Sequence, residues 1–516
     1  MIMMQRTVRP LCLAAATAAA LSSGVQAQDL SFEDGVLGSG ITYNLTGAAG
    51  FYYLLPSLSQ GPTPLVIIDP LDTRLLSVGI DQLSLASLGF MPGTVTIPLP
   101  DNPAFQGIPV YAQYITITGL TATLADQVSN QAAFVMAQTC SSHLTLGDNF
   151  EPRQGHTLTS LPDGSAVMLG GDDPSGATGL TTLGTVERYN RATQSWTNLG
   201  SILTSQRSTH TATALNDGRV LAVGGYDITG VVNATAEIFD PNTNTVSAAA
   251  SMSFARTQHT ATLLNDGRVL VTGGGSNFDL SDPLGSLGSA SATTEIYDPV
   301  SDTWSLGPGL AKPTIGHTAT LLDDGRVMIL GGVEVDVVFG LPLPSFSNRV
   351  QLFDPSSNSF SNGASIPGGR AYHGTAKLAD GSVLACGGAD GDFVLLSFNP
   401  RSDAYRYNPS TNTWSNTATM LSARAYPNFV SLGDRHYIIG GLQTVDVTTG
   451  SGLPNQGVDY YDGATGSWTS CATTQGAREV GRTAIVDNGA RILFAGTGVV
   501  PAGAPVDRTA ELILPE

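Results

Sequence analysis

The sequence predicts an all-β protein, with a small N-terminal β-sandwich followed by a seven-bladed β-propeller. Glycine and proline are abundant, at 60 and 29 of 516 residues, while only 13% of the residues are charged. This balance suits many short strands joined by turns. In addition, one hairpin-like phrase recurs along the last two thirds of the chain, and a second phrase follows most copies of it. Helical periodicity is not evident after the first 27 residues.

Residues 1–27 have the features of a signal peptide. Two arginines precede an apolar, alanine-rich run at residues 11–21, and the stretch GVQA that ends at Ala27 fits a cleavage site. The run is short for a membrane anchor, and no later stretch is long and apolar enough to span a bilayer. We therefore expect a mature chain from about Gln28, exported by a bacterial Sec-type pathway and either periplasmic or secreted.

The charge of the chain limits its partners. The whole sequence carries a formal net charge of −19, with 23 Lys plus Arg against 42 Asp plus Glu. Removing the two arginines of the signal segment leaves 21 basic residues against the same 42 acids, or −21. Such a surface repels nucleic acid and anionic membranes. We expect neither as a partner, and no membrane span after signal cleavage.

Residues 28–138 do not repeat. Segments such as GITYNLTG, FYYLLPSL and GTVTIPLP are short, apolar or alternating, and broken by Pro and Gly. This pattern predicts a small β-sandwich. The stretch GTVTIPLPDNPAFQGIPVYAQ resembles part of the accessory sandwich domains attached to secreted bacterial proteins, a resemblance that implies no activity.

The repeated phrase has the pattern of a β-hairpin. In HTATLLNDGRVLVTGG, residues 259–274, a first strand leads to an Asp-Gly turn, and an apolar second strand ends in two glycines. The Gly-Gly pairs follow one another at intervals of 49 to 58 residues. They begin at Gly170, Gly224, Gly273, Gly331, Gly387 and Gly440, with Ala495-Gly496 as a degenerate seventh.

The second phrase, for example TEIYDPVSDTW at residues 294–304, has the pattern of strand, turn, strand. All four tryptophans of the chain occupy its last position: Trp196, Trp304, Trp414 and Trp468. A tryptophan used in one register of a repeat indicates packing between neighbouring units rather than a set of binding sites.

A period of about 50 residues, four strands per unit, a Gly-Gly pair and a later aromatic-to-Trp pair make up the kelch pattern. From His156 to the C-terminus the sequence resembles kelch-repeat β-propellers, particularly the bacterial secreted kind grouped with the galactose oxidase central domain. The resemblance implies four-stranded blades stacked around an axis, and we assign residues 139–516 to the propeller. The seventh repeat stops after its third strand, at TAELILPE. We therefore expect about residues 134–146 to supply the closing strand.

Histidines and arginines recur at fixed positions just before the first strand. A ring of histidines around the central channel could hold a metal, but we favour a structural role in which each His bonds the turn of its own blade. An Arg stands three residues earlier in six repeats, and pairing with third-strand acids or amides between blades would explain both sets. The histidines are His156, His210, His259, His317 and His373. The arginines are Arg153, Arg207, Arg256, Arg370, Arg424 and Arg478. Their candidate partners are Glu187, Glu237, Glu295, Gln351, Asp459 and Glu511.

A copper radical oxidase is a more specific functional alternative for these residues. In the galactose oxidase family an adjacent Tyr-His pair ligates copper, and RAYHGTAKLADG, which contains Tyr372 and His373, has that form. Tyr426 could imitate a second ligand tyrosine. The family also needs a Cys bonded to a ligand Tyr and a distant second His, whereas Cys386 lies in a core strand and His436 in a hairpin strand. We therefore expect no cofactor, copper included, and no metal site. Two acidic loops, at residues 170–176 and 387–393, are interpreted as solvated loops rather than calcium sites.

We expect an exported binding or interaction module that recognises a carbohydrate, or another extracellular ligand such as a protein, at the funnel of the propeller. The most polar and aromatic residues expected at the funnel come from two neighbouring repeats. They are Arg370, Tyr372, His373, Arg424, Tyr426 and Asn428. The alternative is that the arginines pair with acids between blades and the tyrosines pack in the core. In that case the loops between Gly-Gly and the third strand become the candidate site.

Two other functions stay open: a copper oxidase or carbohydrate-modifying enzyme like the periplasmic kelch sugar epimerases, and a structural surface protein. No catalytic set can be assigned from spacing, and binding is favoured over catalysis. A monomer is expected.

Three cysteines follow the signal segment, so an exported chain has at most one internal disulfide. Cys140 lies in the expected closing strand of the seventh blade, and Cys471 follows Trp468 at the end of the adjacent sixth repeat. A bridge between these two residues would lock the ring, and it is the pairing that we predict.

Overall fold

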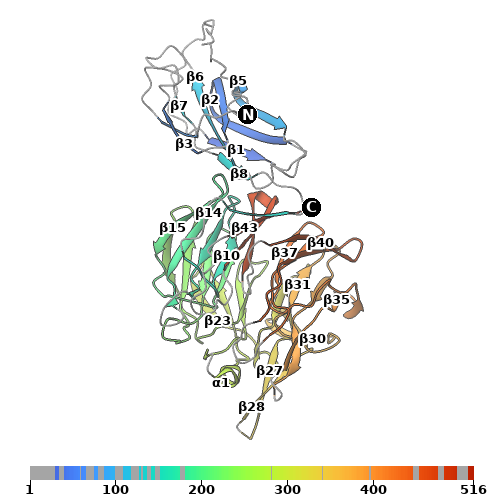
Figure 1. The fold of residues 1–516 in the computed structure, drawn as a ribbon. Coiled ribbons are helices and arrows are strands. Elements are labelled where there is room, and N and C mark those ends of the chain that lie inside the picture. Colours follow the sequence, from blue (N-terminus) through green and yellow to red (C-terminus); the bar gives the residue numbers. More distant parts are fainter. Residues whose placement is uncertain are drawn as a thin grey trace. The chain divides into compact units, whose positions relative to one another are not determined.

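The structure is a computed structural model. It describes the backbone of the strands between residues 29 and 135, and then residues 141–145, 151–174, 181–279, 282–339, 341–393, 397–445, 452–474, 481–496 and 510–515. The predicted signal peptide lies outside these residues. The chain divides into two compact units, Met1–Met136 and Ala137–Glu516. Strands dominate both units, which confirms the all-β prediction (Figure 1).

The first unit contains two antiparallel sheets. A six-stranded sheet is built around β2 (Gly40–Ser57) and β6 (Pro109–Ile117), and the other sheet has two strands. The remaining strands of the larger sheet are β1 (Asp29–Glu33), β5 (Ser87–Pro98), β7 (Gln127–Val128) and β8 (Ala132–Val135). The smaller sheet pairs β3 (Gln60–Pro64) with β4 (Leu75–Val78). The sandwich packing of this unit remains a prediction.

Among its described residues, the second unit contains seven four-stranded antiparallel sheets, here called blades 1 to 7 in chain order. Blade 1 is β10 (Thr157–Ser160), β11 (Ala166–Leu169), β14 (Thr185–Asn190) and β15 (Ser195–Ser201). Blade 2 is β16 (Thr211–Ala214), β17 (Val220–Val223), β18 (Ala236–Asp240) and β19 (Thr245–Ala249). Blade 3 is β20 (Thr260–Leu263), β21 (Val269–Thr272), β22 (Thr294–Asp298) and β23 (Thr303–Leu306).

The other four blades repeat this order. Blade 4 is β25 (Thr318–Leu321), β26 (Val327–Leu330), β29 (Val350–Asp354) and β30 (Ser359–Gly363). Blade 5 is β31 (Gly374–Lys377), β32 (Val383–Cys386), β35 (Ala404–Asn408) and β36 (Thr413–Asn416). Blade 6 is β37 (Asn428–Leu432), β38 (Arg435–Ile439), β39 (Gly457–Asp462) and β40 (Ser467–Thr473). Blade 7 is β41 (Arg482–Val486), β42 (Arg491–Ala495), β43 (Ala510–Leu514) and β9 (Ser141–Leu144), with a 3₁₀ turn at Asp487–Gly489.

The hairpin phrase folds as its sequence indicates. The second strand of blade 3, β21, is buried along its whole length, as expected for an apolar strand covered by the two adjacent blades. In the turn before it, Gly267 has a φ of +87°. The carboxylate of Asp266 accepts a hydrogen bond of 3.1 Å from the backbone N–H of Arg268, which fixes the turn.

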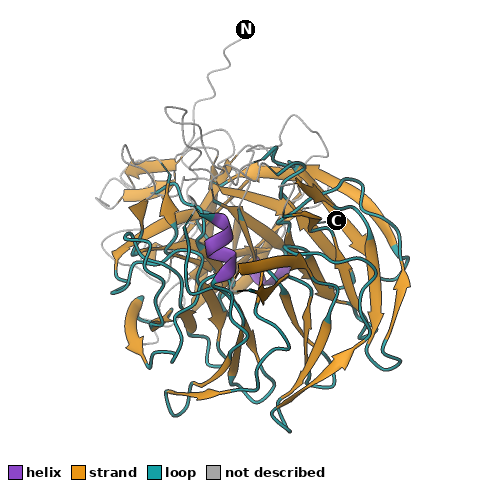
Figure 2. Cartoon of the chain, turned by 90° about the horizontal axis from the view of Figure 1, so that it is seen from below, coloured by secondary structure: helices purple, strands orange, loops and turns teal. Residues whose placement is uncertain are grey.

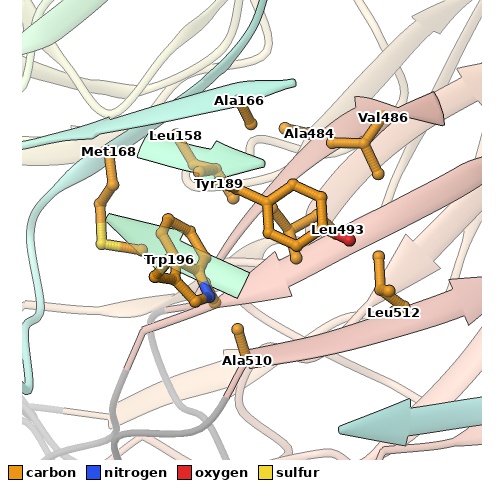
Figure 3. Close-up of a cluster of buried hydrophobic side chains, with 11 residues drawn as sticks. Leu158, Ala166, Met168, Tyr189, Trp196, Ala484, Val486, Leu493, Ala510 and Leu512 are labelled. Atoms are coloured by element: carbon orange, nitrogen blue, oxygen red, sulfur yellow. The ribbon is translucent and has the colours of Figure 1, made fainter. Parts of the chain in front are cut away.

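The blades close into a ring. The first strand of each blade contacts the first strand of the next, and β41 of blade 7 contacts β10 of blade 1. Figure 3 shows the apolar packing at this last junction, where Tyr189 and Trp196 of blade 1 lie beside Val486, Leu493 and Leu512 of blade 7. The junction therefore has a continuous core, as the other blade interfaces do.

The N-terminal end of the propeller unit supplies the fourth strand of blade 7. β9 pairs antiparallel with β43, from Ser141 opposite Leu514 to Leu144 opposite Glu511. The side chain of Ser142 also donates a 2.7 Å hydrogen bond to the carbonyl of Thr473 in blade 6. This pairing covers the edge of β43. The expected range, 134–146, was too wide, because Phe134 and Val135 belong to β8 and the first unit.

The loops between the second and third strands differ from blade to blade. Blade 1 carries a short pair, β12 (Asp172–Asp173) and β13 (Thr181–Thr182). Blade 3 carries helix α1 (Pro283–Gly288), drawn in purple in Figure 2. Blade 4 has β27 (Val333–Val338) and β28 (Leu341–Phe346), joined by β24 (Thr314–Ile315) from the preceding connection. Blade 5 has β33 (Ala389–Asp392) and β34 (Ser397–Pro400). These insertions shape one face of the propeller.

Candidate functional site

The five repeated arginines that the structure describes are buried and structural, while Arg478 lies outside the described residues. Arg207 is fully buried, and its guanidinium donates to the carbonyls of Gly224 (2.9 Å) and Thr235 (3.1 Å) and to a carboxylate oxygen of Glu237 (2.6 Å). Arg256 makes the equivalent set of bonds with its own acid, Glu295. These ion pairs lie within one repeat, so our expectation of pairing between blades was wrong. The guanidinium instead joins the second and third strands of its own blade.

Arg370 and Arg424 follow the same rule. Both are fully buried, and they pair with Asp403 at 2.7 Å and with Asp459 at 2.5 Å. Arg401 binds Asp403 as well, at 2.8 and 2.7 Å. Although burial opposes it, the hydrogen bonds and charges of Arg401 and Arg370 hold the pKa of Asp403 down to about 2. Neither Arg370 nor Arg424 therefore presents its donors to a ligand, in contrast to our expectation.

The histidines join neighbouring blades. The Nε2 atom of His210 lies 3.1 Å from Oγ1 of Thr157 in blade 1, and Nε2 of His373 lies 2.9 Å from Oγ1 of Thr318 in blade 4. Our expectation that each His bonds the turn of its own blade was wrong, because four of the five histidines bond a first-strand Thr of the preceding blade: His210, His259, His317 and His373. Burial lowers the pKa of these imidazoles well below the ordinary value, so they are neutral at pH 7. In blade 6 Pro427 takes the position of these histidines, and the predicted site residue Asn428, which follows it, is also buried.

The residue just before each of these histidines, and just before Pro427 in blade 6, has a left-handed backbone. The φ angle is +52° at Gln258, +67° at Gly316, +52° at Tyr372 and +51° at Tyr426. The backbone N–H of Tyr372 donates to the carbonyl of Gly316 at 2.9 Å, and that of Tyr426 donates to the carbonyl of Tyr372 at 3.0 Å. These bonds run from blade to blade at the innermost end of the first strands.

Tyr372 and Tyr426 are the two predicted site residues that remain accessible. Their rings stack with centroids 4.2 Å apart, and 38% of Tyr426 is exposed. A Cβ atom on Gly316 would lie 2.6 Å from the ring of Tyr372, so glycine makes room for that ring. The Tyr372 hydroxyl lies 3.4 Å from Oε1 of Gln258 in the connection to blade 3. The two tyrosines thus lie together at the funnel. The other four predicted residues are buried within the blades: Arg370, His373, Arg424 and Asn428.

The Tyr372–His373 pair does not fit a copper centre. Tyr372 stacks on Tyr426, while the Nε2 atom of His373 already bonds Thr318. Cys386 is a buried free thiol in the apolar core between blades 5 and 6, and burial raises its pKa to about 12. In the described part of the chain, no group of three or more His, Cys, Asp or Glu could hold a metal ion.

The first acidic loop is not a solvated loop. Asp172 is buried, and it accepts hydrogen bonds from the hydroxyls of Ser208 (2.6 Å), Tyr226 (2.5 Å) and Thr182 (2.9 Å). Burial and the neighbouring Asp172 carboxylate raise the pKa of Tyr226, so it stays a neutral donor. The bonds from Ser208 and Tyr226 tie blade 1 to the connection that enters blade 2 and to the loop after the second strand of blade 2.

A pocket of about 540 Å³ lies between the inserted hairpins of blades 4 and 5. We call it the interblade pocket. Its residues are Pro344, Ser345 and Phe346 of β28, Gly368 and Gly369 of the connection between the blades, Asp390, Gly391 and Asp392 of β33, and the nearby Phe393 and Arg401. The second acidic loop thus forms one wall of the pocket.

The interblade pocket combines aromatic faces with an ion pair. The rings of Phe346 and Phe393 stack with centroids 4.8 Å apart, and Phe398 meets Phe346 edge-on at 5.5 Å. Arg401 donates to Asp390 at 2.5 Å, and 38% of the Asp390 side chain is exposed. This arrangement offers flat apolar surface beside strong hydrogen-bonding groups, as small-molecule sites do.

The pocket and the funnel tyrosines share one cluster of side chains. Phe346, Tyr372 and Phe393 all pack against a buried group of Ile315, Val333 and Ala371. Phe346, Phe393 and Arg401 were not predicted as site residues, because they lie in insertions that do not repeat. The only signal was the difference in length and composition of these loops from one repeat to the next.

Comparison with known proteins points to one architecture. The chain matches no family model. It is 26% identical over 152 residues to Kelch-like protein 36 of Bos taurus, which covers 30% of this chain and 23% of that protein. It is 28% identical over 178 residues to Kelch-like protein terF of Aspergillus terreus, covering 33% of this chain and 35% of that protein. The chain therefore spans about a quarter to a third of the length of these relatives.

Among solved structures, the chain is similar to a fungal alcohol oxidase of the AA5 family in complex with copper. The TM-score is 0.56 at 16% sequence identity, with 71% of this chain and 75% of that chain covered. At this identity the similarity shows the fold alone. A search of the described residues finds no helix long and apolar enough to cross a membrane.

Proposed function

Because the chain is a kelch-repeat β-propeller protein, we propose that it is an exported binding module that holds a carbohydrate in the interblade pocket. The kelch fold indicates an interaction module. The interblade pocket is the observation that supports a carbohydrate as the ligand. Its volume of about 540 Å³ falls within the ordinary range of small-ligand sites, about 300–1,000 Å³. The binding site thereby moves from the funnel itself to the loops beside it.

The chemistry of the pocket suits a sugar. The apolar C–H face of a pyranose ring packs on aromatic rings, and Phe346 and Phe393 supply such rings in the wall of the pocket. Sugar hydroxyls both donate and accept hydrogen bonds. Asp390 can accept from one hydroxyl while Arg401 donates to a neighbouring one, and charge-assisted bonds of this kind are the stronger class.

Two features support export. The first 27 residues have the pattern of a signal peptide. Cys471 is disulfide-bonded, and disulfides persist in the periplasm and outside the cell rather than in the cytosol. The proposed location is therefore periplasmic or extracellular, where oligosaccharides are accessible ligands.

The proposal is tested with the purified mature chain on an array of oligosaccharides, followed by calorimetric titration of the strongest hit. Phe393→Ala removes one aromatic wall, and Asp390→Asn removes the charge of the acceptor. We expect each to weaken binding about tenfold or more, because each removes a contact inside the pocket.

Phe254→Ala is the matched control, since Phe254 is an exposed phenylalanine in the connection between blades 2 and 3. Near-ultraviolet circular dichroism checks that all three variants are folded. If no glycan binds, or if both pocket variants bind as tightly as the wild type, the interblade pocket is not a carbohydrate site.

A further inference from the structure

The hairpin of β27 and β28 carries an exposed apolar tip. In Figure 1 it extends beyond the neighbouring loops of the propeller, at the label β28. Residues 337–343, VVFGLPL, contain no charged or hydrogen-bonding side chain. Val337, Phe339 and Leu341 are 67%, 102% and 66% exposed. Large apolar side chains gathered at one exposed point mark an interaction site more often than an ordinary surface.

Phe339 is unfavourable in two ways at once. Its ring is fully in solvent, and its φ angle is +51°, a conformation that bulky residues adopt rarely and at a cost in energy. Gly, Asn or Asp would satisfy the same turn without either penalty. Among the residues that the structure describes, none packs on the Phe339 ring to offset these two costs. A ligand or partner that buries the ring would offset them.

The base of the hairpin is firmly packed. Val333 and Val335 are buried, and helix α1 contacts both strands, with Pro342 close to Gly288. The backbone of β24 extends the sheet on the side of β27. The tip is therefore held at a fixed position by packed neighbours.

The hairpin is unsuited to pairing strand against strand. Pro342 and Pro344 lie opposite Val337 and Val335 and have no N–H group. In a hairpin with a two-residue turn, the backbone nitrogens of Pro342 and Pro344 point away from β27, toward the free edge of β28. That edge therefore lacks two of the N–H donors that a partner strand would need. A partner must therefore recognise the tip through its side chains.

We propose that the partner is a second copy of this chain, with the Phe339 tip of each copy seated in the interblade pocket of the other. The pocket lies at the base of the same hairpin, where Pro344, Ser345 and Phe346 form one wall. The tip and the base are about 13 Å apart, at about 3.3 Å per residue over four residues. Two hairpins lying antiparallel therefore bring each tip to the other's pocket, and a twofold axis makes both contacts identical.

Charge favours this approach over the alternatives. The chain carries a net charge of −19, so most faces of two copies repel each other, but the neutral tip does not. Added salt screens the long-range repulsion, with a Debye length of about 8 Å at physiological ionic strength. An anionic membrane is disfavoured because Asp336, Asp390 and Asp392 flank the hairpin and its pocket.

The experiment is sedimentation equilibrium of the purified mature chain across a range of protein and NaCl concentrations, without added ligand. We expect a monomer–dimer equilibrium that tightens as salt rises. Phe339→Ser and Phe393→Ala should each raise the dimer dissociation constant about tenfold or more. Phe254→Ser, which alters an exposed phenylalanine elsewhere, should leave it unchanged.

Mixing the two variants supplies a second readout. Phe339→Ser keeps an intact pocket and Phe393→Ala keeps an intact tip, so their equimolar mixture should associate more than either alone. A wild-type chain that stays monomeric throughout, or a Phe393→Ala chain that dimerises like the wild type, overturns the proposal. So does binding of neutral phosphatidylcholine vesicles through Phe339 without self-association.

The sugar and the Phe339 tip are proposed for the same pocket, but the two proposals can be distinguished. Phe339 does not line the pocket of its own chain, so Phe339→Ser should retain glycan binding while losing dimerisation. A dimer without glycan binding, or glycan binding without a dimer, would separate the two proposals.

Discussion

The Nε2 atom of His317 lies 3.0 Å from Oγ1 of Thr260 in the preceding blade and 2.9 Å from Oγ1 of Thr272 in the strand beside it. The imidazole is buried at the junction between blades 3 and 4. Four more histidines occupy the same repeat position, and burial is the largest cause that lowers the pKa of each. Neutral imidazoles thus join blades 1 to 5 to one another, which makes the stability of the propeller depend on pH.

Stability should fall as the pH drops from about 6.5 to about 4. Burial lowers the pKa of His317 to about 4, while an unfolded histidine titrates near its ordinary value, about 6.5. Between these values the unfolded chain binds more protons, so the free energy of unfolding is greatest above about pH 6.5 and decreases below it. His317 alone accounts for about 3 kcal/mol of this loss. Urea unfolding at a series of pH values measures it.

The direct check is the NMR titration of the His317 ring, with His317→Gln to assign its signal. The variant should show a shallower pH dependence than the wild type. A ring that titrates near pH 6.5 in the folded protein would contradict the prediction.

Gly273→Ala should destabilise the propeller by about 2 kcal/mol or more. The φ angle of Gly273 is +61°, and an added Cβ would lie 2.5 Å from the carbonyl oxygen of Thr314 and 2.7 Å from the ring of His317. The substitution therefore combines backbone strain with a clash against the next blade. Thermal or urea unfolding gives the difference.

Gly433→Ala is the matched control. Gly433 has a φ of +57° but no atom within 4 Å of an added Cβ, so it reports the backbone strain alone. Equal losses in the two variants would show that the close approach between blades is unimportant.

Arg207→Gln should cost about 3–5 kcal/mol. Arg207 and Glu237 are both buried, and removing one partner leaves the other charge without compensation. Arg219→Gln, in the exposed pair with Asp217, should cost about 1 kcal/mol at most. Urea unfolding of the two variants compares them, and similar losses would mean that the buried pair adds little to the blade.

The repeated positions could be predicted from the sequence because one physical requirement acts on all blades. The apolar second strand, the Asp-Gly turn and the Gly-Gly pair each recur for that reason, and the structure shows all three at residues 259–274. The bonds of His317 to Thr260 had a signal as well, since Thr follows His in the preceding repeat. Sequence alone, however, does not tell whether a polar side chain bonds within its own blade or the next.

The candidate site could not be predicted in the same way. Arg370 was expected at the funnel, but it pairs with Asp403, which lies two residues before the usual third-strand position of the acid. Phe346 and Phe393 lie in hairpins that occur once each, so no periodicity marks them. Only the folded ring brings these two insertions together.

The last prediction concerns the closure of the ring. Cys471 is disulfide-bonded, and Cys386 is a free buried thiol. The expected partner, Cys140, lies outside the described residues, but it directly precedes Ser141, the first residue of β9, and β9 contacts β40, which contains Cys471. A Cys140–Cys471 bridge would close a loop that spans most of the propeller, and such a long loop restricts the unfolded chain strongly.

Cys140→Ser should therefore lower stability by about 2–5 kcal/mol, and a reductant should lower the melting temperature of the wild type but not of this variant. Cys386→Ala is the control, since it should keep the sensitivity to reductant. Peptide mapping under non-reducing conditions identifies the bridge. A bridge that joins Cys471 to another residue would contradict the pairing, and the closure of blade 7 would then rest on the backbone bonds between β9 and β43 and on the apolar packing of Leu512 against blade 1.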